Sequence, residues 1–407
     1  MIDFESVKKA SRVLALKTES EKNKALENIS NALIENADLI QKENEKDLVL
    51  ARENGLKESM IARLTLKSSQ VLAIAKDILN VISLNDPIGE VVEDFVSKDG
   101  LNIKKVRVPM GVIGVIYEAR PNVTVDVTVL CIKTGNACVL KGGKEAKFTN
   151  ELLVKIIKKA ISSVIPETSI MLLSDRLETN ELLKAKGSVD LIIPRGSKNL
   201  INYVVENSIV PVIETGAGVC HTYVEKSANF ETAIKIIDNA KTSKPAVCNS
   251  LETLLIDRDI IDAFAPIVTK FASEKGVKLY ANKDTISYLP TATLIEDSGY
   301  HTEYNSLDLS VKVVDGVDDA ISHIERYSTK HSECIISTDK AVIDKFLSGI
   351  DSACVYANAS TRFSDGGCFG MGAEIGISTQ KLHARGPMGL KEITTYKYVI
   401  YGNGEIR

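Results

Sequence analysis

The chain has 407 residues, of which 44% are hydrophobic and 26% are charged, and its 50 basic and 54 acidic residues leave a formal net charge of -4. This length predicts two or three domains, and the composition is that of a globular protein with full cores. The near balance of charge gives no basic footprint for nucleic acid, although local basic patches can still bind phosphorylated small molecules.

The sequence carries no sign of export or of membrane insertion. Its first residues, MIDFE, lack the basic and apolar regions of a signal peptide, and no apolar run is long enough to span a bilayer. The seven cysteines are scattered without a CxxC pair, which favours free thiols in a reducing compartment. We therefore expect a cytoplasmic protein without a membrane partner. With only five histidines and no clustered Cys/His spacing, we expect no metal site.

The N-terminal part of the chain is predicted to be helical. Leu26, Ile29, Leu33, Ala37 and Ile40 recur at helical spacing with charged residues between them. This pattern is typical of helices that lie on a core, and it indicates no chemistry.

A β-hairpin is predicted next. Two β-prone runs, 91–96 and 103–108, flank Asp99 and Gly100, and Asp-Gly is a strong hairpin signal because glycine tolerates the positive φ of the turn. A hairpin alone is marginally stable, so it must lie on this chain or on another subunit. We favour a subunit contact.

From residue 111 short apolar strands alternate with helices. Predicted strands cover 112–117, 138–141, 170–173, 189–193 and 210–214, with helices at 123–134 and 150–163. After about Glu214 a second unit repeats the alternation, with helices at 230–241 and 260–275, a strand at 252–257 and a late strand at 392–401. Such alternation implies parallel sheets covered on both faces, which bind ligands at the carboxyl ends of their strands.

The cysteines fall into two groups. Four lie in apolar surroundings and are predicted to be small buried hydrophobes: Cys131, Cys138, Cys334 and Cys354. Cys220, Cys248 and Cys368 lie among Gly, Asn or His instead. Cys220 adjoins His221, but neighbours in an extended stretch point to opposite faces, so we expect no dyad. Cys248 precedes a predicted strand, where a thiol can be exposed, but composition and spacing leave the choice among the three open.

Three glycine-containing turns could hold a nucleotide. The chain has neither GxGxxG after its first strand nor GxxxxGK[ST], but it has KGGK at 141–144, PRGS at 194–197 and ETGAG at 214–218. Free N–H groups at a helix start attract phosphate, and glycine permits close approach. Each segment is equally consistent with an ordinary turn, and Ser197 with a helix N-cap.

Four longer segments carry a resemblance to a known family. They are VPMGVIGVIYEARPN at 108–122, KPAVCNSLET at 244–253, VYANASTRF at 355–363 and STQKLHARGPMG at 378–389. In this order they resemble the γ-glutamyl phosphate reductase (glutamate-5-semialdehyde dehydrogenase) family, a branch of the aldehyde dehydrogenase superfamily. The resemblance covers nearly the whole chain.

The resemblance implies an α/β fold like that of aldehyde dehydrogenases, with two doubly wound domains and a small β oligomerisation module. The NADP-binding domain would comprise residues 1–88 and 109–217, the catalytic domain 218–388, and the module 89–108 and 389–407. The protein would be a homo-oligomer with its active site in the cleft between the two larger domains. Family members work next to a glutamate kinase, which makes that enzyme an implied partner.

The implied reaction is the NADPH-dependent reduction of L-glutamyl 5-phosphate to L-glutamate 5-semialdehyde with release of phosphate, in proline biosynthesis. Cys248 aligns with the family nucleophile, whose thiolate would form a thioester that accepts hydride. This requires a locally lowered thiol pKa. Asn122 aligns with the side-chain donor of the oxyanion hole, and the backbone N–H of Cys248 would be the other donor.

The resemblance also implies a cofactor site for NADP(H). Lys141 aligns with the lysine that meets the adenosine ribose, and Lys144 falls where NAD-preferring relatives often carry Glu, so a lysine there suits a 2′-phosphate. Gly196 and Ser197 match the helix start that holds the pyrophosphate. Glu303 matches the glutamate near the nicotinamide ribose, although a solvated loop carboxylate is an alternative.

Other polar residues have less defined roles. Arg120 and Arg362 are candidates for the substrate carboxylate or phosphate, because a guanidinium fork matches such groups, but they could equally make structural pairs. Glu214 aligns with the general base of hydrolytic relatives, and we expect no catalytic role because the acceptor here would be phosphate rather than water. His383 and Arg385 match a family signature, and the sequence gives them no physical role.

Two rival functions stay open. The first is another acyl-CoA or semialdehyde dehydrogenase of the same superfamily, which a test of phosphate dependence would separate. The second is a non-catalytic nucleotide-binding protein on this fold, because a fold alone does not fix a function.

Overall fold

The computed structural model describes residues 2–406, and the chain divides into two compact units. Unit 1 runs to Thr215 and also contains Gly370–Gly376 and the segment from Met388 onward, and unit 2 comprises Gly216–Phe369 and Ile377–Pro387. The chain first passes from unit 1 to unit 2 after Thr215, which is two residues before the predicted boundary. Residues 370–376 belong to unit 1, whereas we had expected them in the catalytic domain.

Unit 1 begins with five helices, α1 (Phe4–Leu14), α2 (Glu19–Glu35), α3 (Ala37–Glu53), α4 (Glu58–Leu64) and α5 (Ser68–Ser83). The five apolar residues of the predicted helical pattern are all buried, and they are divided between α2 and α3. Thr18 and Glu21 form a capping box that starts α2. No helix among the described residues is long and apolar enough to cross a membrane.

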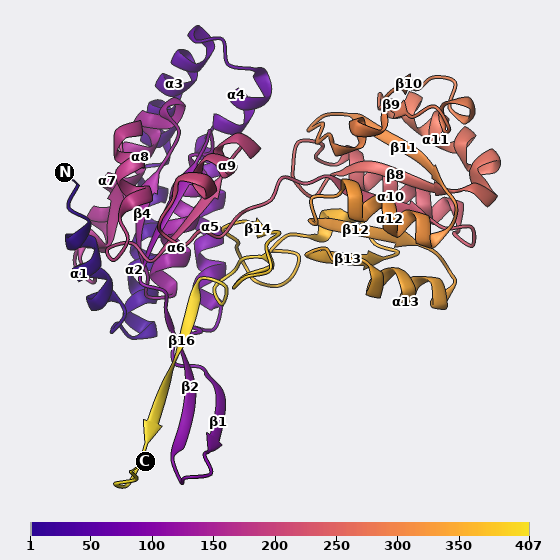
Figure 1. Cartoon of the computed structure of the whole chain (residues 1–407). Coiled ribbons are helices and arrows are strands. Elements are labelled where there is room, and N and C mark those ends of the chain that lie inside the picture. Colours follow the sequence, from indigo (N-terminus) through magenta and orange to yellow (C-terminus); the bar gives the residue numbers. More distant parts are fainter. Residues whose placement is uncertain (1, 407) are drawn as a thin grey trace. The chain divides into compact units, whose positions relative to one another are not determined.

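The sheet of unit 1 has four parallel strands in the order β5-β4-β3-β6. Figure 1 labels β4 among the helices of this unit. These strands are β3 (Val112–Tyr117), β4 (Ala137–Lys141), β5 (Ile170–Leu172) and β6 (Leu191–Arg195), and the helices between and after them are α6 (Asn122–Lys133), α7 (Lys147–Ile161), α8 (Arg176–Lys184) and α9 (Lys198–Asn207). Every residue of β3 is buried, as expected for a strand covered on both faces.

One predicted strand of this unit is wrong. Residues 210–214 form no strand, and only Val212 makes an isolated bridge to Ile192. Pro211 lacks an N–H and so cannot donate to a ladder, which limits this segment to a single bridge.

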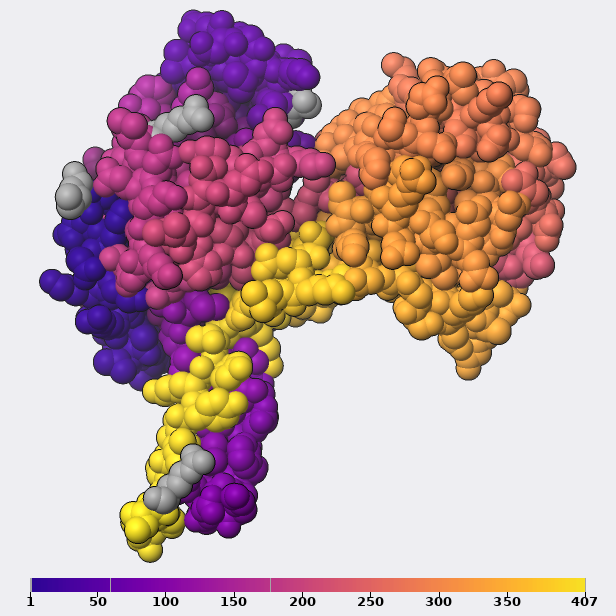
Figure 2. Space-filling view, viewed as in Figure 1, coloured from indigo at the N-terminus to yellow at the C-terminus, as the bar shows by residue number. Residues whose placement is uncertain are grey.

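The predicted hairpin is confirmed. It consists of β1 (Val91–Val96) and β2 (Asn102–Pro109), with Gly100 at φ +90° in the turn. The predicted late strand is β16 (Thr394–Tyr401), which pairs antiparallel with β2 along its whole length. Figure 2 shows this yellow segment lying along the purple hairpin. The hairpin is therefore supported by its own chain, and the favoured contact with another subunit stays a prediction.

The sheet of unit 2 has seven parallel strands in the order β10-β9-β11-β8-β7-β12-β13. They are β7 (Cys220–Val224), β8 (Leu251–Asp257), β9 (Lys278–Ala281), β10 (Thr293–Leu294), β11 (Asp308–Val314), β12 (Ser332–Ile336) and β13 (Cys354–Ala357). The helices are α10 (Phe230–Thr242), α11 (Ile261–Lys275), α12 (Val317–Tyr327) and α13 (Lys340–Gly349), and β14 (Ile377–Ser378) pairs antiparallel with β15 (Gly386–Pro387). The alternation of strands and helices predicted parallel sheets in both units, and the resemblance implied the doubly wound architecture.

Candidate active site

Cys248 lies in unit 2, in the segment that joins α10 to β8, and its side chain is partly exposed. This places it at the amino end of β8. Gly218 precedes β7, which neighbours β8 on one side, and Glu303 precedes β11, which neighbours it on the other. Because the strands are parallel, these three segments meet at one edge of the sheet.

Gly218 packs directly against the backbone of Cys248. A Cβ atom on Gly218 would lie 1.4 Å from the carbonyl oxygen of Cys248 and 2.9 Å from its Cα, so only glycine fits here. The N–H of Gly218 donates to Oε1 of Glu303 at 2.8 Å, and the thiol of Cys220 donates to the Cys248 carbonyl at 3.2 Å. Sequence reasoning treated Gly218 only as a turn residue, and it thus missed this contact.

The residue after Cys248 is held from the other side. Nη1 of Arg362 donates to Oδ1 of Asn249, and Nε of Arg362 donates to Oγ of Ser243 at 3.2 Å. Asn249 in turn donates to the carbonyl of Ser364 at 2.8 Å and accepts from Oγ1 of Thr361 at 2.8 Å. Arg362 thus makes structural contacts within the protein, which was the alternative to a role in substrate binding. Its role in substrate binding stays a prediction.

The remaining cysteines behave as the sequence suggested, except that Cys220, which we had grouped with the thiols in polar surroundings, is buried in β7. Cys131, Cys138, Cys334 and Cys354 are buried, and Cys368 is exposed. Cys220 is also buried, which raises the pKa of its thiol. It faces the Cys248 carbonyl, whereas His221 contacts Glu333 with its backbone N–H at 2.8 Å. Cys220 and His221 therefore form no dyad.

A buried ion pair lies beside the Cys248 segment. Nζ of Lys241, at the end of α10, is 2.8 Å from Oε2 of Glu252, in β8, and both side chains are almost fully buried. Burial raises the pKa of Glu252 to about 7 and lowers that of Lys241. Oε1 of Glu252 accepts the N–H of Asn305, which has a φ of +56° and lies two residues after Glu303. The pair thus links the strand behind Cys248 to the loop that carries Glu303.

Lys241→Met is expected to destabilise unit 2 by about 3–5 kcal/mol at pH 8, because it leaves the Glu252 carboxylate buried without its counter-charge. The lone carboxyl would have a still higher pKa, so the native state would hold a proton that the unfolded state releases. The deficit relative to the wild type should therefore shrink as the pH falls from 8 to 6. Urea denaturation at both pH values, followed by circular dichroism, measures this.

The double variant Lys241→Met/Glu252→Gln is the matched control. It removes both charges but keeps an oxygen to accept the N–H of Asn305, and it should recover most of the lost stability. If Lys241→Met unfolds at the wild-type urea concentration at pH 8, Lys241 does not compensate the charge of Glu252.

Four of the five predicted cofactor residues, Lys141, Lys144, Gly196 and Ser197, lie at the carboxyl edge of the sheet in unit 1, whereas Glu303 lies in unit 2. Lys141 ends β4, Arg195 ends β6, and Gly196 and Ser197 follow it at the start of α9. Glu118 comes directly after β3, which lies between β4 and β6. This edge agrees with the general location of ligands in parallel sheets.

The start of α9 binds an anionic group of the chain itself. The carboxylate of Glu118 accepts the N–H of Ser197 at 2.7 Å and its hydroxyl at 3.0 Å, and a Cβ on Gly196 would lie 2.5 Å from the same carboxylate. The Ser197 hydroxyl also accepts from the N–H of Leu200, so the N-cap interpretation is confirmed as well. Glu118 was missed by the sequence reasoning, although it lies in the first segment of the resemblance.

The two lysines of the KGGK turn differ in environment. Nζ of Lys141 donates to the carbonyl of Gly142 at 2.6 Å, and partial burial lowers the pKa of this lysine. Lys144 is exposed. The neighbouring Glu145 is held by the N–H of Ala119 at 2.7 Å.

Asn122 is the first residue of α6, and Nδ2 of its amide donates to Oδ2 of Asp126 at 2.9 Å. Arg120, two residues before it, is partly exposed in the turn after β3. Asn122 belongs to unit 1 and Cys248 to unit 2.

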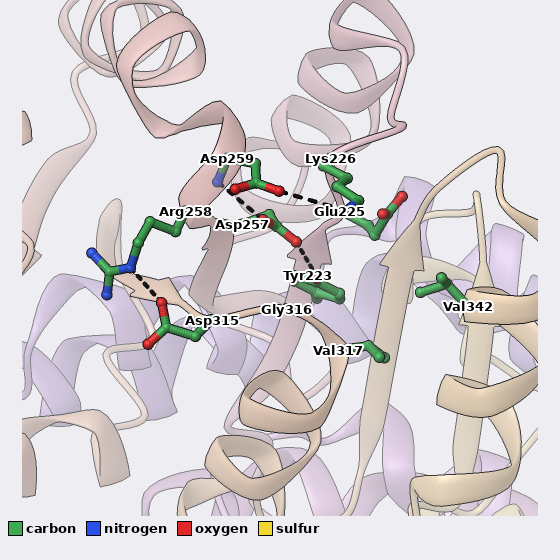
Figure 3. A pocket seen from close by; sticks show the side chains of 10 residues that line it. All are labelled: Tyr223, Glu225, Lys226, Asp257, Arg258, Asp259, Asp315, Gly316, Val317 and Val342. Carbon is green, nitrogen blue, oxygen red and sulfur yellow. Dashed lines mark hydrogen bonds and ion pairs between the residues drawn. The ribbon is translucent and has the colours of Figure 1, made fainter.

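A hollow of about 390 Å³ lies at the opposite edge of the unit 2 sheet, at the carboxyl ends of β7, β8 and β11 (Figure 3). Its acidic residues are paired: Tyr223 donates to Asp257 at 2.6 Å, and Asp315 pairs with Arg258. It contains no thiol. The expectation of ligands at carboxyl ends thus suits the cofactor residues of unit 1 but not Cys248, which lies at an amino edge.

The described residues include no group of His, Cys, Asp and Glu that could hold a metal ion.

The structure gives Arg385 a role in holding its loop. Arg385 donates from Nη1 to Oδ1 of Asp351 at 2.8 Å and from Nη2 to its carbonyl at 2.9 Å. Lys381 lies 2.7 Å from the same carboxylate. His383, between them, has a φ of +67°, so this segment forms a tight turn.

Comparison with known proteins places the chain among related sequences. Residues 4–286 match the aldehyde dehydrogenase family. The γ-glutamyl phosphate reductase of Caldanaerobacter subterraneus subsp. tengcongensis is 50% identical over 100% of this chain and 99% of the relative, and that of Clostridium perfringens is 48% identical over 100% and 99%.

Solved structures agree with these matches. The crystal structure of γ-glutamyl phosphate reductase from Thermotoga maritima is 44% identical and superposes with a TM-score of 0.96 over 99% of this chain and 98% of that chain. An acetylating aldehyde dehydrogenase from Geobacillus thermoglucosidasius is 18% identical, with a TM-score of 0.70 over 99% and 96%. This second likeness shows the fold alone.

Proposed function

This chain belongs to the aldehyde dehydrogenase family and, within it, to the γ-glutamyl phosphate reductases, and we propose that it reduces L-glutamyl 5-phosphate to L-glutamate 5-semialdehyde with release of phosphate, in proline biosynthesis. The observation that carries the proposal is the partly exposed Cys248, whose backbone is fixed by Gly218 and Cys220 on one side and whose neighbour Asn249 is fixed on the other. A thiol held in this way is preorganised for attack on an acyl group.

The proposed reaction starts with attack of the Cys248 thiolate on the acyl carbon. The S–C bond forms, the C–O bond to phosphate breaks, and phosphate leaves with the bonding electrons. NADPH, when bound, supplies the hydride that brings the thioester carbon to the oxidation level of an aldehyde. The C–S bond then breaks and returns the thiolate of Cys248.

The oxyanion of each addition step would be stabilised by two donors, the side-chain amide of Asn122 and the backbone N–H of Cys248. Donors fixed where charge develops are typically worth on the order of 10²–10³-fold each in rate. The fixed backbone of Cys248 supports this role, because the N–H needs no rearrangement when the charge forms.

For the cofactor we propose NADP(H), held by Lys141, Lys144, Gly196, Ser197 and Glu303. The residues fit such a group, because the start of α9 already binds the carboxylate of Glu118 with the N–H and hydroxyl of Ser197. A pyrophosphate would take the place of that carboxylate. Glu303 would meet the nicotinamide ribose, which its contact with Gly218, beside Cys248, supports.

Lys144→Glu is expected to raise the KM for NADPH by roughly 10-fold or more, because it replaces a partner of the 2′-phosphate with a like charge. The KM for NADH should change by much less, since NADH has no 2′-phosphate. Initial rates with each cofactor measure the ratio.

Lys147→Glu is the matched control, because Lys147 is also exposed and lies only three residues further along the chain. It should leave the ratio of the two KM values near that of the wild type. An equal loss with NADPH and NADH in Lys144→Glu would contradict the assignment of the 2′-phosphate.

The phosphate requirement tests the proposed function itself. With glutamate 5-semialdehyde and NADP⁺, the appearance of NADPH at 340 nm should require inorganic phosphate, because phosphate is the group that accepts the acyl from Cys248. Coenzyme A in its place should not support the reaction. Equal rates without phosphate would favour a hydrolytic semialdehyde dehydrogenase instead.

We also propose that the chain forms a homo-oligomer through the sheet of β1, β2 and β16. Apolar side chains on both outer strands are exposed, among them Val91, Phe95, Tyr398 and Ile400. A row of exposed apolar side chains on edge strands is typical of a surface that another chain covers.

A further inference from the structure

Asn122 and Asp126 form a hydrogen-bonded pair one turn apart on α6. They are four residues apart, which places them on the same face of the helix. Nδ2 of Asn122 lies 2.9 Å from Oδ2 of Asp126, and both side chains are partly exposed. The opposite side of the helix is anchored separately, because Thr124 is buried and donates to Asn150 at 2.9 Å. The pair is therefore not needed to attach α6 to the core.

An asparagine amide can present either an oxygen or an N–H to a substrate, and a rotation of 180° exchanges them. Only the N–H stabilises an oxyanion, and the oxygen would repel it. A carboxylate is an acceptor alone, so an ionised Asp126 can bond only to the NH₂ group of Asn122. One hydrogen of Nδ2 is then bound to Asp126, which leaves the second for another acceptor.

We propose that Asp126 is the positioning residue that fixes the Asn122 amide with its N–H available to the acyl oxygen. This inference rests on the proposed function, in which Asn122 is the oxyanion donor. Asp126 acts through Asn122 and touches neither the substrate nor the cofactor in this role.

The surroundings of Asp126 determine the pH range in which its carboxylate can accept the hydrogen bond from Asn122. Burial raises the pKa of Asp126 to about 6, while the hydrogen bond from Asn122 and the charge of Arg195, at the end of β6, oppose the shift and Asp77, on α5, adds to it. At pH 8 the carboxyl is ionised and accepts from Nδ2. As the pH falls through about 6 it takes up a proton, and its O–H can then donate to Oδ1 of a rotated Asn122, which turns the oxygen outward.

A double-mutant cycle tests the coupling. At pH 8 Asp126→Leu should lower kcat by roughly 10–100-fold, and Asn122→Ala should lower it by on the order of 10²–10³-fold. The double variant should be no slower than Asn122→Ala alone, because Asp126 has nothing to position once the amide is gone. The KM for glutamate 5-semialdehyde should change little. Binding of NADPH, followed by its fluorescence, checks that each variant is folded.

Asp126→Asn provides a second readout that does not depend on the tolerance of leucine. It keeps the shape and an acceptor oxygen but cannot titrate, so kcat at pH 8 should be only about three- to tenfold below the wild type. The wild-type kcat should fall as the pH drops through about 6, and this decrease should be absent from Asp126→Asn. Titration of the phosphate co-substrate affects both enzymes equally.

Three results would overturn the inference. Losses that multiply in the double variant would mean that Asp126 acts separately from Asn122. A raised KM with an unchanged kcat in Asp126→Leu would assign Asp126 to the α-ammonium group of the substrate. Full activity of Asn122→Ala, with the phosphate requirement intact, would remove the oxyanion role of Asn122 and this inference with it, while the proposed reaction at Cys248 would still stand.

Discussion

Cys248→Ala is expected to lower turnover by roughly 10⁴-fold or more, because it removes the thiol that is proposed to form the covalent acyl intermediate. NADPH should still bind with a Kd within about twofold of the wild-type value, since the proposed phosphate and adenosine contacts lie in unit 1. Steady-state rates in the direction of NADP⁺ reduction and a fluorescence titration with NADPH measure the two quantities.

Cys368→Ser is the matched control for this variant. Cys368 is in the same unit and is the more exposed thiol, and its backbone N–H donates to Oδ1 of Asp365 at 3.2 Å. Its replacement should leave kcat unchanged. Measurable turnover in Cys248→Ala, above the level that contamination explains, would remove Cys248 as the nucleophile.

Gly218→Ala is expected to lower kcat/KM by roughly 10²–10³-fold although the new methyl group has no chemistry of its own. Its Cβ would lie 1.4 Å from the carbonyl oxygen of Cys248 and 2.4 Å from the carbonyl carbon, and both are backbone atoms that no side-chain rotation can move away. The Cys248 segment must therefore shift, and misplacement of a reacting group by about 1 Å can cost on the order of 10²-fold. The rate at which iodoacetamide alkylates Cys248, measured by mass spectrometry, should change along with kcat/KM.

Gly216→Ala in the same loop provides the comparison. Its Cβ would meet Cγ2 and Oγ1 of Thr379 at 2.3 and 2.8 Å, which are side-chain atoms of a residue that can shift, whereas Gly218 meets backbone, so the effect should be smaller than that of Gly218→Ala. Equal effects of the two substitutions would indicate general disruption of the loop. A thermal transition close to that of the wild type would show that Gly218→Ala remains folded.

Together the two variants separate the chemistry of Cys248 from its placement. Cys248→Ala removes the thiol and leaves the segment in position, whereas Gly218→Ala keeps the thiol and moves the segment. The same distinction applies in unit 1, where Asn122 would donate to the substrate and Asp126 would orient the donor.

Several features of the fold could be predicted from sequence because they depend on local periodicity. The hairpin around Gly100, the buried strand β3 and the helical core residues of α2 and α3 all follow from alternation or helical spacing. The separation of Cys220 from His221 follows from the same rule, since neighbours in a strand point to opposite faces. The strand predicted at 210–214 failed because Pro211 removes a donor that apolar patterning does not register.

The candidate site likewise contains some features that could be predicted from the sequence and others that could not. The sequence, through its long matching segments, selected Cys248, Asn122 and the cofactor residues, and the pair of Asn122 with Asp126 was within reach of helical spacing alone. The contacts of Gly218 with Cys248 and of Glu118 with Ser197 were not, because each joins segments tens of residues apart. They exist because β7 lies beside β8, and β3 beside β6, in parallel sheets. The order of strands in a sheet is a property of the whole fold, so the sequence determined which residues we propose for the chemistry, and only the tertiary structure decided which residues hold them in place.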